Sequence, residues 1–269
     1  MIISPEHKFI FFKSQKTAGS SIGGALAKFC SESDLIVGSL NNSTNEWEYK
    51  SQNNLSSCGN YHLFHQHCDP EHFFNNIKDT KRFEKFDQIT IVRNPWDVVI
   101  SHWFYVQKWM LKKHSHLYIY PISEGFNRIG PDGTEYPVDW VLGKNDTKQI
   151  AVSKFKKWCT QIYPHKTYHS GDKIVWETGI DTSARNERFV HERITNFIRY
   201  EHLEDDYKIF LLQKNLKFRP LPRFKTNKMA GVERYHYSYY YDKELINLVR
   251  EKFPKTINKF GYEFERRNK

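Results

Sequence analysis

Residues 9–12, Phe-Ile-Phe-Phe, form a continuous apolar run that a polar loop and then a helix-like stretch follow. An apolar run of this length is typical of a strand buried on both faces of a sheet. A second such strand is predicted at residues 86–92, and a third at residues 194–200 precedes a helix predicted at 201–214. Repeated strand–helix units favour an α/β fold with a central parallel sheet flanked by helices.

The chain has 269 residues, which is enough to bury a substantial core without disulfides. We expect a single domain over residues 1–269, with further helices at 70–77 and 238–253. Residues from about 114 to 190 are expected to form an irregular insertion, a lid or acceptor wall. No apolar run approaches the roughly 18 residues of a membrane helix, and the first residues lack the features of a signal peptide. We therefore expect a cytoplasmic protein with no membrane segment.

Charge points to an anionic partner. Lys and Arg number 41 against 31 Asp and Glu, a formal net charge of +10. A basic nucleic-acid-binding protein is one alternative, although the basic residues are dispersed rather than clustered. The four cysteines include no CxxC pair, so neither a zinc ribbon nor a disulfide framework is predicted.

The loop after the first strand has the properties of a phosphate-binding turn. A backbone turn at a helix N-terminus offers N–H donors and the positive end of the helix dipole. Lys16 begins a run of small residues that let a ligand approach the backbone, namely Thr17, Ala18, Gly19, Ser20 and Ser21. Ser20 or Ser21 is expected to cap the helix. An ATP-binding P-loop requires glycine before the lysine, so a nucleotide or small-molecule kinase is a weaker alternative.

A second polar segment follows the second strand. Arg93 ends that strand, Asn94 is a suitable N-cap, Pro95 suits the first helical position and Asp97 lies in the first turn. Ser101 follows on the same helix face as Asn94 and Asp97. Arg93 can grip a phosphate through charge-assisted hydrogen bonds, and the Ser101 hydroxyl can add another. The alternative to a phosphate-binding role is that this segment only caps the helix.

These two segments together resemble the sulfotransferases that use 3′-phosphoadenosine 5′-phosphosulfate (PAPS). Residues 16–21 resemble that family's 5′-phosphosulfate loop, and residues 91–101 resemble its 3′-phosphate motif. The resemblance implies a P-loop-kinase-like sulfotransferase architecture, PAPS as the donor, the bisphosphate PAP as the product, and no metal. It assigns residues 16–21, Arg93 and Ser101 to cofactor binding. One departure is Gln15, which stands where the family usually has proline.

Sulfuryl transfer to a hydroxyl requires a base, and histidine has a suitable pKa of about 6.5. Residues 64–67, Phe-His-Gln-His, resemble the His-x-His of the glycan 2-O-sulfotransferases. We choose His67 as the base, with His65 as its alternate or as a second acceptor contact. A metal site is a rival reading, but the candidate ligands lack paired spacing; they are Cys58, His62, His65, His67 and Cys68. Ordinary surface histidines are the other alternative, favoured for His62 and His72.

The resulting prediction is an in-line transfer of the sulfuryl group from PAPS to an acceptor hydroxyl. Lys16 is expected to donate to the bridging oxygen and to stabilise the departing PAP. Branch resemblance alone favours a hydroxyl-bearing carbohydrate, and an acidic one suits the positive charge. Phe104, Tyr105 and Trp109 are candidates to stack on sugar rings, whereas helical spacing favours a core position for Trp103.

Overall fold

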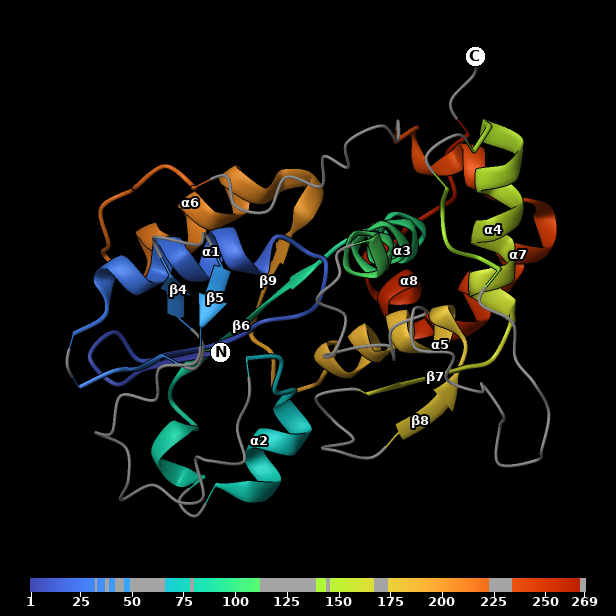
Figure 1. Cartoon of the computed structure of the whole chain (residues 1–269). Coiled ribbons are helices and arrows are strands. Elements are labelled where there is room, and N and C mark those ends of the chain that lie inside the picture. Colours follow the sequence, from blue (N-terminus) through green and yellow to red (C-terminus); the bar gives the residue numbers. More distant parts are fainter. Residues whose placement is uncertain are drawn as a thin grey trace. The chain divides into compact units, whose positions relative to one another are not determined.

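The computed structural model describes residues 1–31, 33–36, 39–41, 46–48, 66–77, 80–111, 139–143, 146–166, 174–222 and 234–266 (Figure 1). The chain divides into two compact units. Unit 1 comprises Met1–Arg93 and Asn186–Thr226, and unit 2 comprises Asn94–Arg185 and Asn227–Lys269. Each unit contains its own buried hydrophobic residues and is described in turn.

Unit 1 is built on a mixed five-stranded sheet with the order β3-β1-β2-β6-β9. Its strands are β1 (Ile2–Ser4), β2 (Phe9–Phe12), β3 (Leu35–Ile36), β6 (Asp87–Val92) and β9 (Asn196–Arg199). β2, β6 and β9 run parallel to one another, whereas β1 is antiparallel to both β2 and β3. The α/β prediction is confirmed, but the sheet is mixed because a tight β1–β2 hairpin adds an antiparallel edge that the sequence analysis missed.

Strand β2 shows why this sheet is buried on both faces. Phe9 and Phe11 pack with apolar residues of α1 (Gly19–Leu26) and α6 (Leu203–Gln213). Ile10 and Phe12 pack on the opposite side with residues of α2 (Pro70–Asn76). Figure 1 shows α1 and α6 together on one side of the sheet and α2 on the other. Alternate side chains of a strand point to opposite faces, so both faces of β2 need a covering layer.

Among the short elements of unit 1, helix α2 begins where the sequence predicts. Asp69 caps α2, since its Oδ1 accepts from the His72 N–H at 2.9 Å, and Pro70 takes the first helical position. The 3-10 turn η7 (Tyr200–His202) joins β9 to α6. A separate two-stranded pair consists of β4 (Ser39–Asn41) and β5 (Glu46–Glu48).

Unit 2 is mainly helical (Figure 1). It contains α3 (Pro95–Leu111), α4 (Lys148–Thr160), α5 (Gly179–Ala184), α7 (Lys243–Lys252) and α8 (Pro254–Phe260), with a hairpin of β7 (Tyr163–Lys166) and β8 (Ile174–Glu177). Its core is strongly aromatic and includes Trp103, as predicted. Phe104 is also buried, with 2% of its surface exposed. It is therefore a core residue and is not available to stack on a sugar.

Two expectations for unit 2 are wrong. Residues 148–166 and 174–185, expected to be irregular, contain regular elements, and capping residues start their helices. Thr147 caps α4, and Thr178 forms a reciprocal capping box with Asp181 at α5. The helix expected at 238–253 is divided, because Asp242 caps a new helix, α7, after the 3-10 turn η8 (Tyr237–Tyr240). Residues 112–138 lie outside the described ranges.

Across the described part of the chain, the search for a helix both long and apolar enough to cross a membrane found none.

Phe73 provides a test of the α2 side of the sheet. Its side chain is fully buried and contacts the rings of Phe12, Phe74 and Phe83 at centroid distances of 5.7, 5.0 and 5.7 Å. We expect Phe73→Ala to lower the free energy of unfolding by about 3–5 kcal/mol, because it removes buried apolar surface and leaves a cavity. Leu212→Ala is the matched control, since that side chain is 73% exposed. Urea denaturation of both variants measures the difference, and equal stabilities would contradict the assignment.

Candidate active site

The loop that joins β2 to α1 has an unusual backbone. Lys16 and Ala18 both adopt left-handed conformations, with φ of 59° and 66°. A non-glycine residue in this region costs about 1–2 kcal/mol, so contacts elsewhere must hold the loop. Where left-handed residues alternate with right-handed ones, successive backbone N–H groups point to one side. They then form a concave anion-binding site, which is called a nest. The loop therefore has the geometry expected of a phosphate cradle.

The N-terminus of α1 carries no side-chain cap. Its N-cap is Ala18, so the expectation that Ser20 or Ser21 caps the helix is wrong; the Ser21 N–H instead donates to the Ala18 carbonyl at 2.9 Å. Among the described residues, the N–H groups of Gly19 and Ser20 have no hydrogen-bond partner. Amide groups at a helix start that the protein leaves unsatisfied are suited to an anionic ligand.

Hydroxyl groups hold the first half of the loop. The Ser14 Oγ donates to the Ile91 carbonyl of β6 at 2.5 Å and lies 2.7 Å from the Thr17 Oγ1. Both side chains are buried, with 2% exposed. The Thr17 hydroxyl is therefore engaged inside the loop, which leaves its backbone N–H as the group suited to a ligand.

Arg93 links the two motifs that the sequence analysis identified. Its Nη1 donates to the Lys16 carbonyl at 2.6 Å, and its guanidinium lies 3.8 Å from the centroid of the Tyr200 ring. Sheet register explains this pair: Val92 of β6 is opposite Arg199 of β9, so the next residue of each strand emerges at the same sheet edge. Sequence reasoning missed Tyr200, although its position directly after a predicted strand was a usable signal.

The remaining residues of the second motif belong to unit 2. Asn94 caps α3 as predicted: its Oδ1 accepts from the backbone N–H of Trp96 at 3.1 Å and of Asp97 at 3.4 Å. Ser101 is buried on the same helix, with 2% exposed. Asp97 forms an ion pair with Arg234 Nη2 at 2.9 Å, a partner that the sequence analysis did not identify. The joint grip of Arg93 and Ser101 on one phosphate stays a prediction.

His67 is oriented by the phosphate loop itself. Its Nδ1 lies 2.8 Å from the Lys13 carbonyl oxygen. Because a carbonyl only accepts hydrogen bonds, the Nδ1 carries the hydrogen, and the Nε2 of the neutral ring holds the lone pair. That is the state a general base requires. His65, the alternate base, and His62 lie outside the described residues.

Lys13 is a site residue that the sequence analysis missed. It is 5% exposed, and its Nζ donates to the Gln66 Oε1 at 2.9 Å. Its side chain crosses Gly19, where an added Cβ would lie 2.6 Å from the Lys13 Cγ. Glycine is thus required at position 19 for the lysine to pass. The sequence analysis assigned no role to Lys13, because sequence alone does not show which loop positions are covered.

The cysteines of this region are poor nucleophiles and poor metal ligands. Burial, helped by nearby Asp34, raises the pKa of Cys30 to about 12, and burial likewise raises the pKa of Cys68. Thiolates are the reactive and metal-binding form. Within the described ranges, no three His, Cys, Asp or Glu side chains are grouped as a metal site requires. Cys58 lies outside those ranges.

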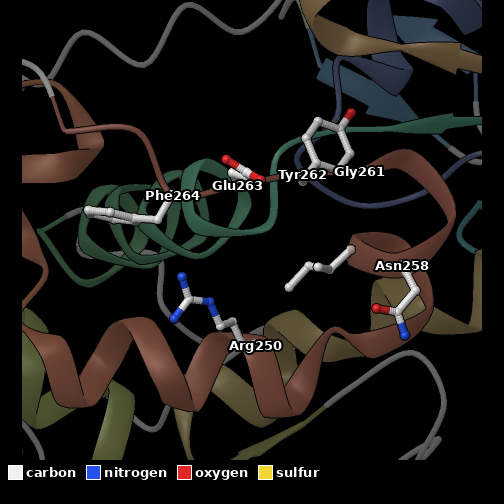
Figure 2. A pocket seen from close by; sticks show the side chains of 7 residues that line it. Arg250, Asn258, Gly261, Tyr262, Glu263 and Phe264 are labelled. Atoms are coloured by element: carbon white, nitrogen blue, oxygen red, sulfur yellow. The ribbon is translucent and has the colours of Figure 1, made fainter.

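A pocket of about 570 Å³ lies within unit 2, along α7, α8 and the chain that follows them (Figure 2). Its polar and aromatic lining includes Arg250, Asn258, Tyr262 and Glu263. Figure 2 shows the Arg250 side chain extending from α7 toward the segment that carries Glu263. The Asn94 Nδ2 donates to the Glu263 carbonyl at 3.4 Å, which connects this segment to the start of α3. The lining chemistry suits a hydroxyl-bearing ligand.

Comparison with known proteins gives one match. The family model described as "Sulfotransferase family" matches residues 1–263, which is almost the whole chain. Searches of curated proteins and of solved structures found no significant match.

Gly19→Ala tests the cradle. The added Cβ would displace the Lys13 side chain and disturb the two unsatisfied N–H groups, so we expect at least tenfold weaker binding of adenosine 3′,5′-bisphosphate, the nucleotide that the resemblance implies. Gly24→Ala, further along α1, is the matched control and should bind like the wild type. Calorimetry measures both affinities. Unchanged affinity in Gly19→Ala would show that the loop does not bind this nucleotide.

Proposed function

This chain belongs to the sulfotransferase family, and from that premise we propose that it transfers the sulfuryl group of PAPS to a hydroxyl of a carbohydrate acceptor. The observation that carries the proposal is the nest at the start of α1, with unsatisfied N–H groups at Gly19 and Ser20 among the described residues. The family match over residues 1–263 also supports treating both units as parts of one sulfotransferase domain.

The residues of the loop fit a 5′-phosphosulfate. The helix dipole and the backbone N–H groups at residues 17–20 suit an anion, and Gly19 allows close approach. Residues 16–21 would hold the 5′ end, while Arg93 and Ser101 would hold the 3′-phosphate. When bound, PAPS supplies an activated sulfuryl group, with PAP as the leaving group.

His67 is our proposed general base. The Lys13 carbonyl accepts from its Nδ1–H, so the Nε2 of the neutral ring carries the lone pair that would take the acceptor hydroxyl proton. This contact also fixes the direction of the ring relative to the phosphate loop, because Lys13 is the residue that leads from β2 into that loop. His65 stays the alternate base or a second contact to the acceptor.

Lys16 supplies positive charge where negative charge develops. We assign its ammonium to the bridging oxygen between the sulfuryl group and the departing phosphate. Its neighbour Lys13 adds a second cation at the same loop. Side-chain cations and the α1 dipole together account for the charge compensation, so the proposal requires no metal.

A carbohydrate is the proposed acceptor class. The likeness of residues 64–67 to the glycan 2-O-sulfotransferases supports it, as does the net charge of +10, which suits an acidic sugar. The pocket in unit 2 offers an arginine, an amide, a carboxylate and an aromatic ring, which are groups that recognise sugars.

Replacement of His67 tests the base. We expect His67→Ala to lower kcat by roughly 10²–10⁴-fold with little change in the KM for PAPS, since general-base catalysis contributes about that much. His72→Ala is the matched control, because His72 is a histidine of the neighbouring helix α2 that is not assigned to the site; its backbone N–H donates to the Asp69 cap side chain. Steady-state sulfation assays of both variants, with His65→Ala beside them, identify the base. Near wild-type turnover of His67→Ala would exclude His67.

Calorimetry in EDTA tests the function itself. We expect tight binding of PAP and at least a hundredfold weaker binding of ATP, because ATP lacks the 3′-phosphate that Arg93 and Ser101 are assigned to hold. Sulfation activity should persist in EDTA. Equal affinity for the two nucleotides would favour a kinase, and salt-dependent retention of DNA or RNA without nucleotide binding would favour a nucleic-acid-binding protein.

A further inference from the structure

We propose that Asn186 is a positioning residue that holds the phosphate loop in its ligand-binding conformation. The inference rests on the proposed function of that loop. It starts from a pair of reciprocal hydrogen bonds between Asn186 and Gln15, two residues that lie 171 positions apart in the sequence.

The Asn186 amide satisfies both backbone polar groups of Gln15. The Gln15 N–H donates to the Asn186 Oδ1 at 2.8 Å, and the Asn186 Nδ2 donates to the Gln15 carbonyl at 3.0 Å. An amide side chain can make both bonds at once because it carries a donor and an acceptor side by side. Asn186 thus grips Gln15 as a neighbouring strand would.

Peptide planarity extends this grip to Lys16. The peptide between Gln15 and Lys16 is planar and trans, so fixing its carbonyl toward Asn186 turns the Lys16 N–H to the opposite side. Arg93 does the same for the next peptide, since it binds the Lys16 carbonyl at 2.6 Å. Asn186 and Arg93 therefore hold both peptides that flank the left-handed Lys16, and together they direct the N–H groups of Lys16 and Thr17. This fixes the backbone that leads into the unsatisfied N–H groups of Gly19 and Ser20.

Asn186 is itself well anchored. It lies in the 3-10 turn η6 (Arg185–Phe189), and Phe189 at the end of that turn is 2% exposed within the same apolar cluster as Phe12. Phe12 is the last residue of β2, directly before the loop. The turn and the start of the loop are thus attached to one packed core, which gives the Asn186 amide a fixed position.

Gln15 has a backbone donor that makes the double contact feasible. A proline at position 15 would lack the N–H and would leave the Asn186 Oδ1 without its bond. Because Gln15 does not restrict its own φ as proline does, the loop depends on a contact from outside. We infer that Asn186 supplies this restraint.

The first experiment measures loop order without ligand. Amide hydrogen exchange of Gln15 and Ser21, whose N–H groups are hydrogen-bonded in the structure, should be at least tenfold faster in Asn186→Ala than in the wild type, with β6 and β9 unchanged. Asn186→Asp keeps the size of the side chain and an acceptor for the Gln15 N–H, but it loses the donor to the Gln15 carbonyl. It should therefore also speed exchange, by a smaller factor than Asn186→Ala, and it controls for misfolding caused by the loss of side-chain volume. Asn196→Ala is the matched control, a half-buried asparagine of unit 1 that bonds Asp87 and Thr195.

The second experiment separates positioning from general stability. In Asn186→Ala, the affinities for PAP and for 5′-AMP should fall by the same factor, roughly tenfold for two lost hydrogen bonds, because the 5′ loop serves both ligands. Ser101→Ala should lower the affinity for PAP and leave the affinity for 5′-AMP unchanged. The KM for PAPS should rise more than kcat falls.

The outcomes distinguish this inference from the function on which it rests. Failure of the wild type to bind PAP would overturn the proposed function. The exchange measurement needs no ligand, so it would still test whether Asn186 holds the loop. Exchange rates in Asn186→Ala equal to those of the wild type would contradict the role of Asn186 in holding the loop. Faster exchange spread over the whole of unit 1 would also contradict it, since that indicates a loss of overall stability alone.

Discussion

The left-handed backbone at Lys16 and Ala18 is the constraint on which the proposed site depends. L-residues avoid this region, so the loop keeps its shape only while other parts of unit 1 hold it. Contacts come from the end of β6 through Ser14 and Arg93, and from η6 through Asn186. The anion-binding loop is thus a local structure, and residues of unit 1 that are distant in the sequence hold its conformation.

Two residues at the loop make a second contact within unit 1. The Arg93 guanidinium that binds the Lys16 carbonyl also lies over the ring of Tyr200, and the Lys13 carbonyl that leads into the loop orients His67. In the proposed mechanism, the donor site and the base are therefore held by the same short stretch of backbone. Such sharing keeps their mutual geometry fixed within unit 1.

Sequence alone predicted the parts of the site that are local in the chain. The strand–loop–helix unit, the Asn94 cap and the strand before Arg93 follow from short-range propensities, and the structure contains them. It missed Lys13, Tyr200 and Asn186 as partners of the loop, because these contacts depend on sheet register and packing. The antiparallel β1–β3 edge was not predicted because β1 and β3 have only three and two residues, too few to show a strand pattern in the sequence.

The register of the three parallel strands has a thermodynamic consequence. The loop, Arg93 and Tyr200 each follow the last residue of one of three adjacent strands, so they meet only when β2, β6 and β9 are paired correctly. A one-residue slip would turn every side chain of a strand to the wrong face. The full arrangement is lost when any one of these strands is unpaired. A ligand that binds all three therefore stabilises the paired sheet against unfolding as well as the loop against local opening.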